Sequence, residues 1–119
     1  MEIETCLHLF VQCQHTNRFW REFESLWADI TSDHIILSEK YIIFGIYDLP
    51  YIPKFLNYCI IEGKQYIFEY KESKKLSIKS FLRKLIYNSK VEKEIAKTYD
   101  KMQVYIKKWK IFNDFTSMR

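Results

Sequence analysis

The sequence predicts an all-α protein, a small bundle of about four helices, and three observations support this fold class. The chain has 119 residues, a length that suits one small domain. It contains only two glycines and two prolines, whereas a β-sandwich needs many tight turns. Apolar residues recur at intervals of three and four along most of the chain, which places them on one face of a helix.

The first helix is expected over residues 18–30, with Thr16 or Asn17 as its N-cap. Its apolar residues lie at helical spacing and form one broad face, which consists of Phe19, Phe23, Leu26, Trp27 and Ile30. Trp20 lies beside this face, so it is the candidate for contact with a protein partner. Residues 1–15 are expected to be irregular and separate from a helical domain at 16–119.

The pattern of residues 39–53 predicts secondary structure less clearly. Residues 39–46 could form a strand or one to two helical turns, because periodicity does not separate these at such a length. Residues 48–53 contain both prolines and predict a loop. A long helix is expected from there to about Lys71. Gly63 in its middle is unfavourable for a helix by about 1 kcal/mol relative to alanine, which suggests a close helix contact at that point.

After a polar break at residues 72–75, Ser77 is expected to cap a third helix with an apolar face of Ile78, Phe81, Leu82, Leu85 and Ile86. Asn88 and Ser89 either interrupt this helix or join it to a fourth at 91–112. The fourth helix would turn a second apolar row to the core, formed by Val91, Ile95, Tyr99 or Thr98, Met102, Ile106 and Trp109.

The segment that starts at Glu4 reads E-T-x-x-H-L-F-x-x-C and is followed by F-W at 19–20. It resembles the zinc-binding segment near the C-terminus of LINE-type (non-LTR) retrotransposon reverse transcriptases, in which a C-x-x-C pair typically precedes these residues. Shorter matches follow in the same order over nearly the whole chain: I-F-G at 43–45, L-N at 56–57, K-Q-Y-I at 64–67 and K-W-x-x-F at 108–112. No C-x-x-C precedes Glu4, so the resemblance implies a segment truncated on its N-terminal side, inside the zinc knuckle.

The resemblance makes His8 and Cys13 the candidate zinc ligands. Structural zinc takes four Cys or His ligands, so this site is incomplete unless Cys6 and His15 complete it. In the alternative, the cysteines are small hydrophobic residues and the histidines are ordinary ones. We therefore expect no cofactor in the isolated chain, and zinc as the metal if one binds.

Positive charge is concentrated in the second half of the chain. Residues 1–60 carry 4 Lys/Arg and 8 Asp/Glu, a net charge of −4, and residues 61–119 carry 15 and 7, a net charge of +8. One row of lysines would lie on the fourth helix opposite its apolar face: Lys90, Lys93, Lys97, Lys101 and Lys108. Such a row could bind RNA or DNA without sequence preference, with Tyr87, Tyr99 and Tyr105 stacking on bases. It could equally be a solvated helix face, with its charge offset by Glu92 and Glu94.

No pattern predicts catalysis, because the chain has no Gly-rich phosphate loop, nucleophile elbow or pair of metal-binding acids. By resemblance, the expected function is non-catalytic nucleic-acid contact. The alternatives are a helical protein-interaction module and the product of a relic or young open reading frame without a selected function. No apolar run approaches the roughly 20 residues of a membrane span, so no membrane partner is expected. Three cysteines without a secretory signal predict an intracellular location, in the nucleus or cytoplasm.

Overall fold

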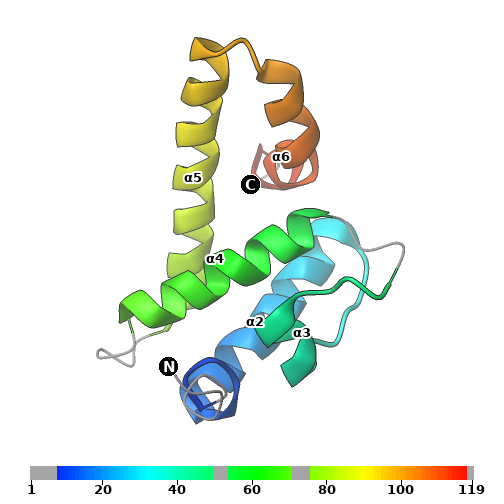
Figure 1. The fold of residues 1–119 in the computed structure, drawn as a ribbon, viewed down its shortest axis with the longest axis vertical. Helices are drawn as coiled ribbons and strands as arrows, with labels where there is room; N and C mark the ends of the chain where they lie inside the picture. The colour runs from blue at the N-terminus through cyan, green and yellow to red at the C-terminus, as the bar shows by residue number, and fades with distance from the viewer. Residues whose placement is uncertain (1–7, 50–53, 71–75, 118–119) are drawn as a thin grey trace.

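The computed structural model describes residues 8–49, 54–70 and 76–117, without the side chains of residues 8 and 12. Within these ranges the chain is all-helical and has no strand, as the sequence predicted. The elements are a short π-helix and five α-helices: η1 (His8–Gln12), α2 (Gln14–Thr31), α3 (Glu39–Phe44), α4 (Lys54–Tyr70), α5 (Ile78–Thr98) and α6 (Met102–Ser117) (Figure 1). Residues 48 and 49 of the predicted proline loop are not helical, whereas its residues 50–53 and the predicted break at 72–75 lie outside the described residues.

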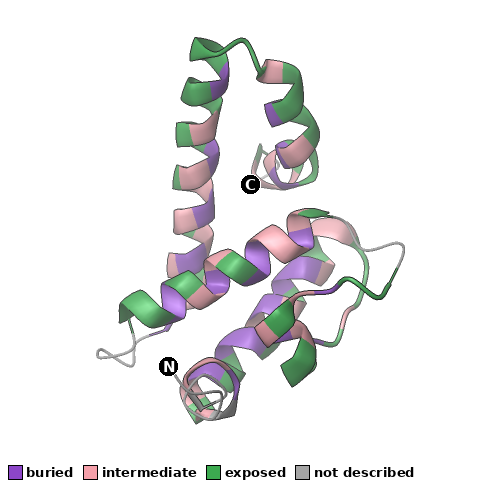
Figure 2. Ribbon diagram, in the orientation of Figure 1, coloured by how far each residue is buried: buried purple, intermediate pink, exposed green. Residues whose placement is uncertain are grey.

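The helices are arranged in two parts that share one core. η1, α2, α3 and α4 lie together, α5 extends away from α4, and α6 turns back beside α5 toward α2 and α4 (Figure 1). The buried residues of α5 and α6 face each other (Figure 2), and Trp109 of α6 contacts the start of α4. The whole molecule measures 43 × 32 × 29 Å.

Aromatic rings connect the two parts. Phe19 of α2 meets Phe81 of α5 with their ring centroids 5.3 Å apart. Phe55 of α4 lies between Trp27 of α2 and Trp109 of α6, at centroid distances of 6.4 and 5.0 Å. Edge-to-face and offset aromatic pairs add stability beyond the apolar area that they bury. Many of the aromatic residues therefore belong to one continuous core.

α2 begins before the predicted position. Cys13 occupies the N-cap without a side-chain cap, and Thr16 is buried inside the helix, where its hydroxyl donates to the Cys13 carbonyl at 2.9 Å. The helix ends at Thr31, one residue after the predicted end, and its C-cap Ser32 has a left-handed backbone with φ 64°. Val11 of η1 belongs to the hydrophobic core, so residues 8–15 pack with the helices. No gap in packing coincides with the division expected after residue 15.

Trp20 is not a surface residue, and the prediction that it meets a partner is wrong. Its side chain is 0% exposed, and its indole nitrogen donates to the Phe10 carbonyl at 2.6 Å. The ring lies against Gly63 of α4, where a Cβ atom would be 2.7 Å from Trp20 Cη2. This contact confirms the close helix approach predicted at Gly63. Trp20 is buried because α4 covers it from one side and η1 from another, which the periodicity of α2 alone cannot indicate.

Residues 39–44 form the helix α3 rather than a strand. The Ser38 hydroxyl caps it by accepting from the Tyr41 backbone at 3.2 Å, and Gly45 ends it with φ 83°. The side chain of Asn57 in α4 then bonds both the backbone N–H and the carbonyl of Ile46, at 2.7 and 2.8 Å. These bonds fix the segment after α3 to α4.

The predicted boundary between the third and fourth helices is wrong. α5 continues through residues 88 and 89 and ends at Thr98, and α6 starts at Met102. Between them Asp100 adopts a left-handed conformation with φ 56°, and the Lys101 N–H donates to the Ala96 carbonyl at 2.8 Å. This is a Schellman-type helix end, which usually requires glycine. Here aspartate adopts it, so the turn carried no obvious sequence signal.

The predicted core face of the second half of α5 is wrong as well. Val91, Ile95 and Tyr99 are 39, 52 and 70% exposed. Ser89 and Ala96 are buried instead, because α6 folds back onto their side of the helix. On α6, Trp109 is buried as predicted, whereas Ile106 is exposed.

Candidate functional site

One exposed face of α5 carries a row of cations, which we call the α5 basic stripe and define as Lys79, Arg83, Lys90, Lys93 and Lys97. Their spacing of four, seven, three and four residues keeps them on one side of a helix. At a rise of about 1.5 Å per residue, the stripe is about 27 Å long. Lys101 is exposed in the turn beyond its end.

Three of the five predicted lysines, Lys90, Lys93 and Lys97, lie on this stripe. Lys108 does not, because it belongs to α6 and its ammonium group points toward α5, where it contacts the Glu92 carboxylate at 2.8 Å. Lys79 and Arg83 also belong to the stripe but were not among the predicted residues, because the predicted row was assigned to a fourth helix at 91–112. The uninterrupted helical spacing from Lys79 to Lys97 was the signal that could have identified them.

The stripe has little acidic compensation. Lys97 pairs with Glu94 at 3.4 Å, but both side chains are more than half exposed, so water screens the pair and it can open readily. Within the part of the chain that the structure describes, no ion pair involves the other four cations.

Two of the three tyrosines proposed for base stacking are accessible. Tyr87 and Tyr99 are exposed on α5 and at its end. Tyr105 is buried, and its hydroxyl is 2.8 Å from Ser89 Oγ, so its predicted stacking role is wrong.

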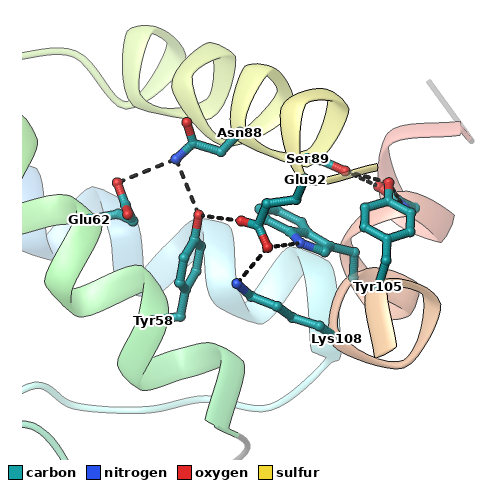
Figure 3. Close-up of polar contacts among 9 residues, drawn as sticks. Tyr58, Glu62, Asn88, Ser89, Glu92, Tyr105 and Lys108 are labelled. Atoms are coloured by element: carbon teal, nitrogen blue, oxygen red, sulfur yellow. Dashed lines mark hydrogen bonds and ion pairs between the residues drawn. The ribbon is translucent and has the colours of Figure 1, made fainter. Parts of the chain in front are cut away.

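A polar cluster joins α4, α5 and α6 behind the stripe (Figure 3). Glu92 is its centre: Oε2 accepts from the Tyr58 hydroxyl at 3.2 Å, and Oε1 accepts from Lys108 Nζ at 2.8 Å and from Trp109 Nε1 at 3.2 Å. The Lys108 ammonium also lies 3.9 Å from the centroid of the Tyr58 ring. Charge-assisted hydrogen bonds of this kind are stronger than neutral ones. Glu92 therefore connects three helices rather than neutralising a surface lysine.

A second group of bonds extends the cluster. Ser89 Oγ donates to Asn113 Oδ1 at 3.1 Å, and Asn113 Nδ2 donates to the Tyr105 hydroxyl at 3.0 Å. Since the Ser89 hydroxyl has only one proton, Tyr105 donates to Ser89 and closes a ring of three bonds. On the other side, Asn88 Nδ2 reaches both the Tyr58 hydroxyl and Glu62, at 3.2 and 3.3 Å. These partners explain why a polar side of α5 is buried.

Two ionisable groups of α4 lie in low-dielectric surroundings. Burial raises the pKa of the Cys59 thiol, and the nearby Glu62 carboxylate adds to the effect. Burial also raises the pKa of the Tyr58 hydroxyl. Both groups therefore stay neutral in the folded protein at a pH where they would ionise in the unfolded chain.

Alkaline pH should therefore destabilise the protein before it ionises Cys59. The unfolded chain loses the thiol proton above roughly pH 8.5 whereas the folded protein keeps it, so the free energy of unfolding should fall by about 1.4 kcal/mol per pH unit beyond that point. Below it, this contribution is constant. Urea unfolding at half-unit steps from pH 7 to 9.5 measures the slope. Cys59→Ala should lack this component, and an identical slope in the variant would contradict it.

The predicted zinc ligands are described only in part. Cys6 and the side chain of His8 lie outside the described residues. Cys13 is half-buried at the N-cap of α2, and His15 is half-buried in its first turn. Among the residues whose side chains are described, no three His, Cys, Asp or Glu side chains are grouped so that they could hold a metal ion. Cys13 and His15 alone do not supply the ligands of a structural zinc site.

Comparisons with models of known families, with curated proteins and with solved structures found no match to this chain. Among the described helices, none is long and apolar enough to cross a membrane.

Proposed function

We propose that this chain is a non-catalytic helical segment that contacts RNA or DNA without sequence preference through the α5 basic stripe. The observation that supports the proposal is a row of five exposed cations, about 27 Å long, with a single acidic partner in a weak surface pair. Lysines that neutralise phosphates release counter-ions, and this gives an affinity that depends on salt and not on sequence. Arg83 is the only arginine of the stripe, so bidentate reading of bases contributes little.

We further propose that the chain corresponds to the C-terminal region of a LINE-type reverse transcriptase, as its sequence resemblance implies. Several residues of that resemblance contact one another, which supports the view that they form one structural unit. Lys64 Nζ donates to the Ile43 carbonyl at 2.9 Å, and Asn57 bonds the residue that follows Gly45. On this proposal, residues 1–15 hold an incomplete zinc knuckle with His8 and Cys13 as its remaining ligands. The residues 16–119 form its helical bundle.

Replacing Lys93, Lys97 and Lys101 with glutamine tests the proposal. The three side chains are exposed, so the melting temperature should stay the same. Affinity for a short single-stranded RNA in about 0.1 M salt should fall roughly 100-fold if all three contact phosphates. Fluorescence anisotropy measures this loss.

The matched control replaces Lys40, Lys54 and Lys110 with glutamine. These lysines are exposed on α3, α4 and α6, away from the stripe, and the change in net charge is the same. Equal weakening by the two triple variants would attribute binding to net charge and contradict a role for the stripe.

The alternative of a protein-interaction module has its own observation. Tyr87, Val91, Ile95 and Tyr99 are exposed at intervals of four residues and form an apolar row beside the stripe. This alternative would be favoured by an apparent molecular mass that rises with protein concentration. Ile95→Asp should then return the mass to that of the monomer. If the protein neither binds RNA nor associates with itself, the remaining interpretation is a relic without a selected function.

A further inference from the structure

A cleft lies between the start of α4 and α6, with a volume of about 600 Å³. Its size falls in the range of small-molecule sites, and its lining is mostly apolar, as such sites usually are. It is separate from the α5 basic stripe, because none of the five stripe residues lines it.

The walls are aromatic on one side and aliphatic on the other. Phe55 and Tyr58 of α4 stack with an angle of 21° between their rings and 5.6 Å between centroids. Val104 and Ile111 of α6 face them across the cleft and are 65 and 48% exposed. These two residues are seven apart, so the apolar wall of α6 extends over about 10 Å. Exposing such apolar side chains to water is unfavourable in free energy, and an apolar ligand that covered them would remove this penalty.

Every charged group in the lining is a cation. Lys108 is held by Glu92, whereas Lys54 and Lys107 make no hydrogen bond or ion pair with any residue in the described ranges. Among the residues that the structure describes, no acidic side chain lines the cleft. The site therefore combines an elongated apolar wall with two unpaired ammonium groups.

We propose that this cleft binds a long-chain carboxylate. Its aliphatic chain lies between the rings of Phe55 and Tyr58 and the side chains of Val104 and Ile111, and its carboxylate meets Lys54 and Lys107. The aliphatic wall on α6 favours a hydrocarbon chain over a nucleobase, because a base gains affinity by stacking on aromatic rings and gains little from Val104 and Ile111. An amphipathic helix contacts its groove through a row of apolar side chains at i, i+3, i+4 and i+7, whereas the wall on α6 offers two aliphatic side chains, so a single hydrocarbon chain fits better.

Laurate is the probe, and binding is followed by the change in tryptophan fluorescence, because the ring of Trp27 borders the cleft. The protein should bind laurate at least tenfold more tightly than dodecanol, which has the same chain and no charge, and should not bind dodecyltrimethylammonium. Equal binding of laurate and dodecanol would overturn the role of the lysines. Binding of an acidic amphipathic peptide but not of laurate would overturn the choice of ligand.

Two pairs of variants locate the site. Val104→Asp should weaken laurate binding at least tenfold, whereas Ile106→Asp, at an exposed residue of the same helix outside the cleft, should not change it. Lys107→Glu should weaken the binding of laurate but not of dodecanol, with Lys110→Glu as its control. Equal losses within either pair would contradict the proposal. The stripe variant with Lys93, Lys97 and Lys101 replaced by glutamine should bind laurate normally, so this test is independent of nucleic-acid binding.

Discussion

Replacing Trp109 with alanine is expected to reduce the free energy of unfolding by about 3–5 kcal/mol. The ring is fully buried, and its centroid lies 5.0 to 5.5 Å from the rings of Phe55, Tyr58 and Phe112. The substitution leaves a cavity between α4 and α6 and also removes the indole hydrogen bond to Glu92. Urea unfolding measures the change.

Ile111→Ala is the control for this substitution. Ile111 lies two residues along α6 and is about half exposed, so its truncation should change stability by roughly 0.5 kcal/mol or less. A Trp109→Ala protein with an unchanged melting temperature would contradict the packing of α6 against the rest of the molecule.

The contact between Trp20 and Gly63 predicts that the effect of Gly63→Ala on the free energy of unfolding changes sign when Trp20 is also replaced. Gly63→Ala should destabilise the protein by about 1–3 kcal/mol, because the added methyl group meets a buried indole ring at 2.7 Å. Trp20→Ala alone should destabilise it by about 3–5 kcal/mol. With Trp20 already removed, the added methyl group meets only the ordinary contact with Phe19 Cε2 at 3.4 Å and the helix gains propensity, so Gly63→Ala should stabilise the protein by up to about 1 kcal/mol.

Chemical denaturation of the four proteins measures the cycle. The coupling between the two sites follows from the difference between the two effects of Gly63→Ala. An effect of the same sign and size in both backgrounds would show that the two residues do not touch, and the crossing of α2 and α4 would then be wrong.

The sequence predicted features that local rules determine. A serine before an apolar helical pattern marked the N-cap at Ser77, and its hydroxyl does accept from the Ser80 backbone. A glycine inside a helix has few causes, and close packing was the correct one for Gly63. The all-helical fold class followed from periodicity in the same way.

Periodicity failed where two faces of one helix looked alike. On α5, Val91 and Ile95 are four residues apart and form an apolar row, and a second helical row contains Ser89 and Ala96, which are seven residues apart. The second row is buried because Tyr105 and Asn113 of α6 provide hydrogen-bond partners for Ser89. Those partners lie 16 and 24 residues away in the chain, so no local pattern reveals them.

The candidate stripe was predicted in part for a related reason. Lys90, Lys93 and Lys97 share a face in any helical interpretation of residues 90–97. Lys108 was added on the assumption that one helix continued to residue 112. The left-handed Asp100 ends that helix, and α6 turns Lys108 toward Glu92. Aspartate tolerates this conformation better than most residues, but it rarely marks it in a sequence.

A salt titration of RNA affinity tests the proposed role of the α5 basic stripe most directly. The logarithm of affinity should fall linearly with the logarithm of salt concentration, and replacing Lys93, Lys97 and Lys101 with glutamine should reduce the slope by about 2 on a single strand. The result should be the same with zinc and with a chelator, because two ligands do not hold a structural metal. No binding at low salt, or an unchanged slope in the variant, would contradict nucleic-acid contact through this face.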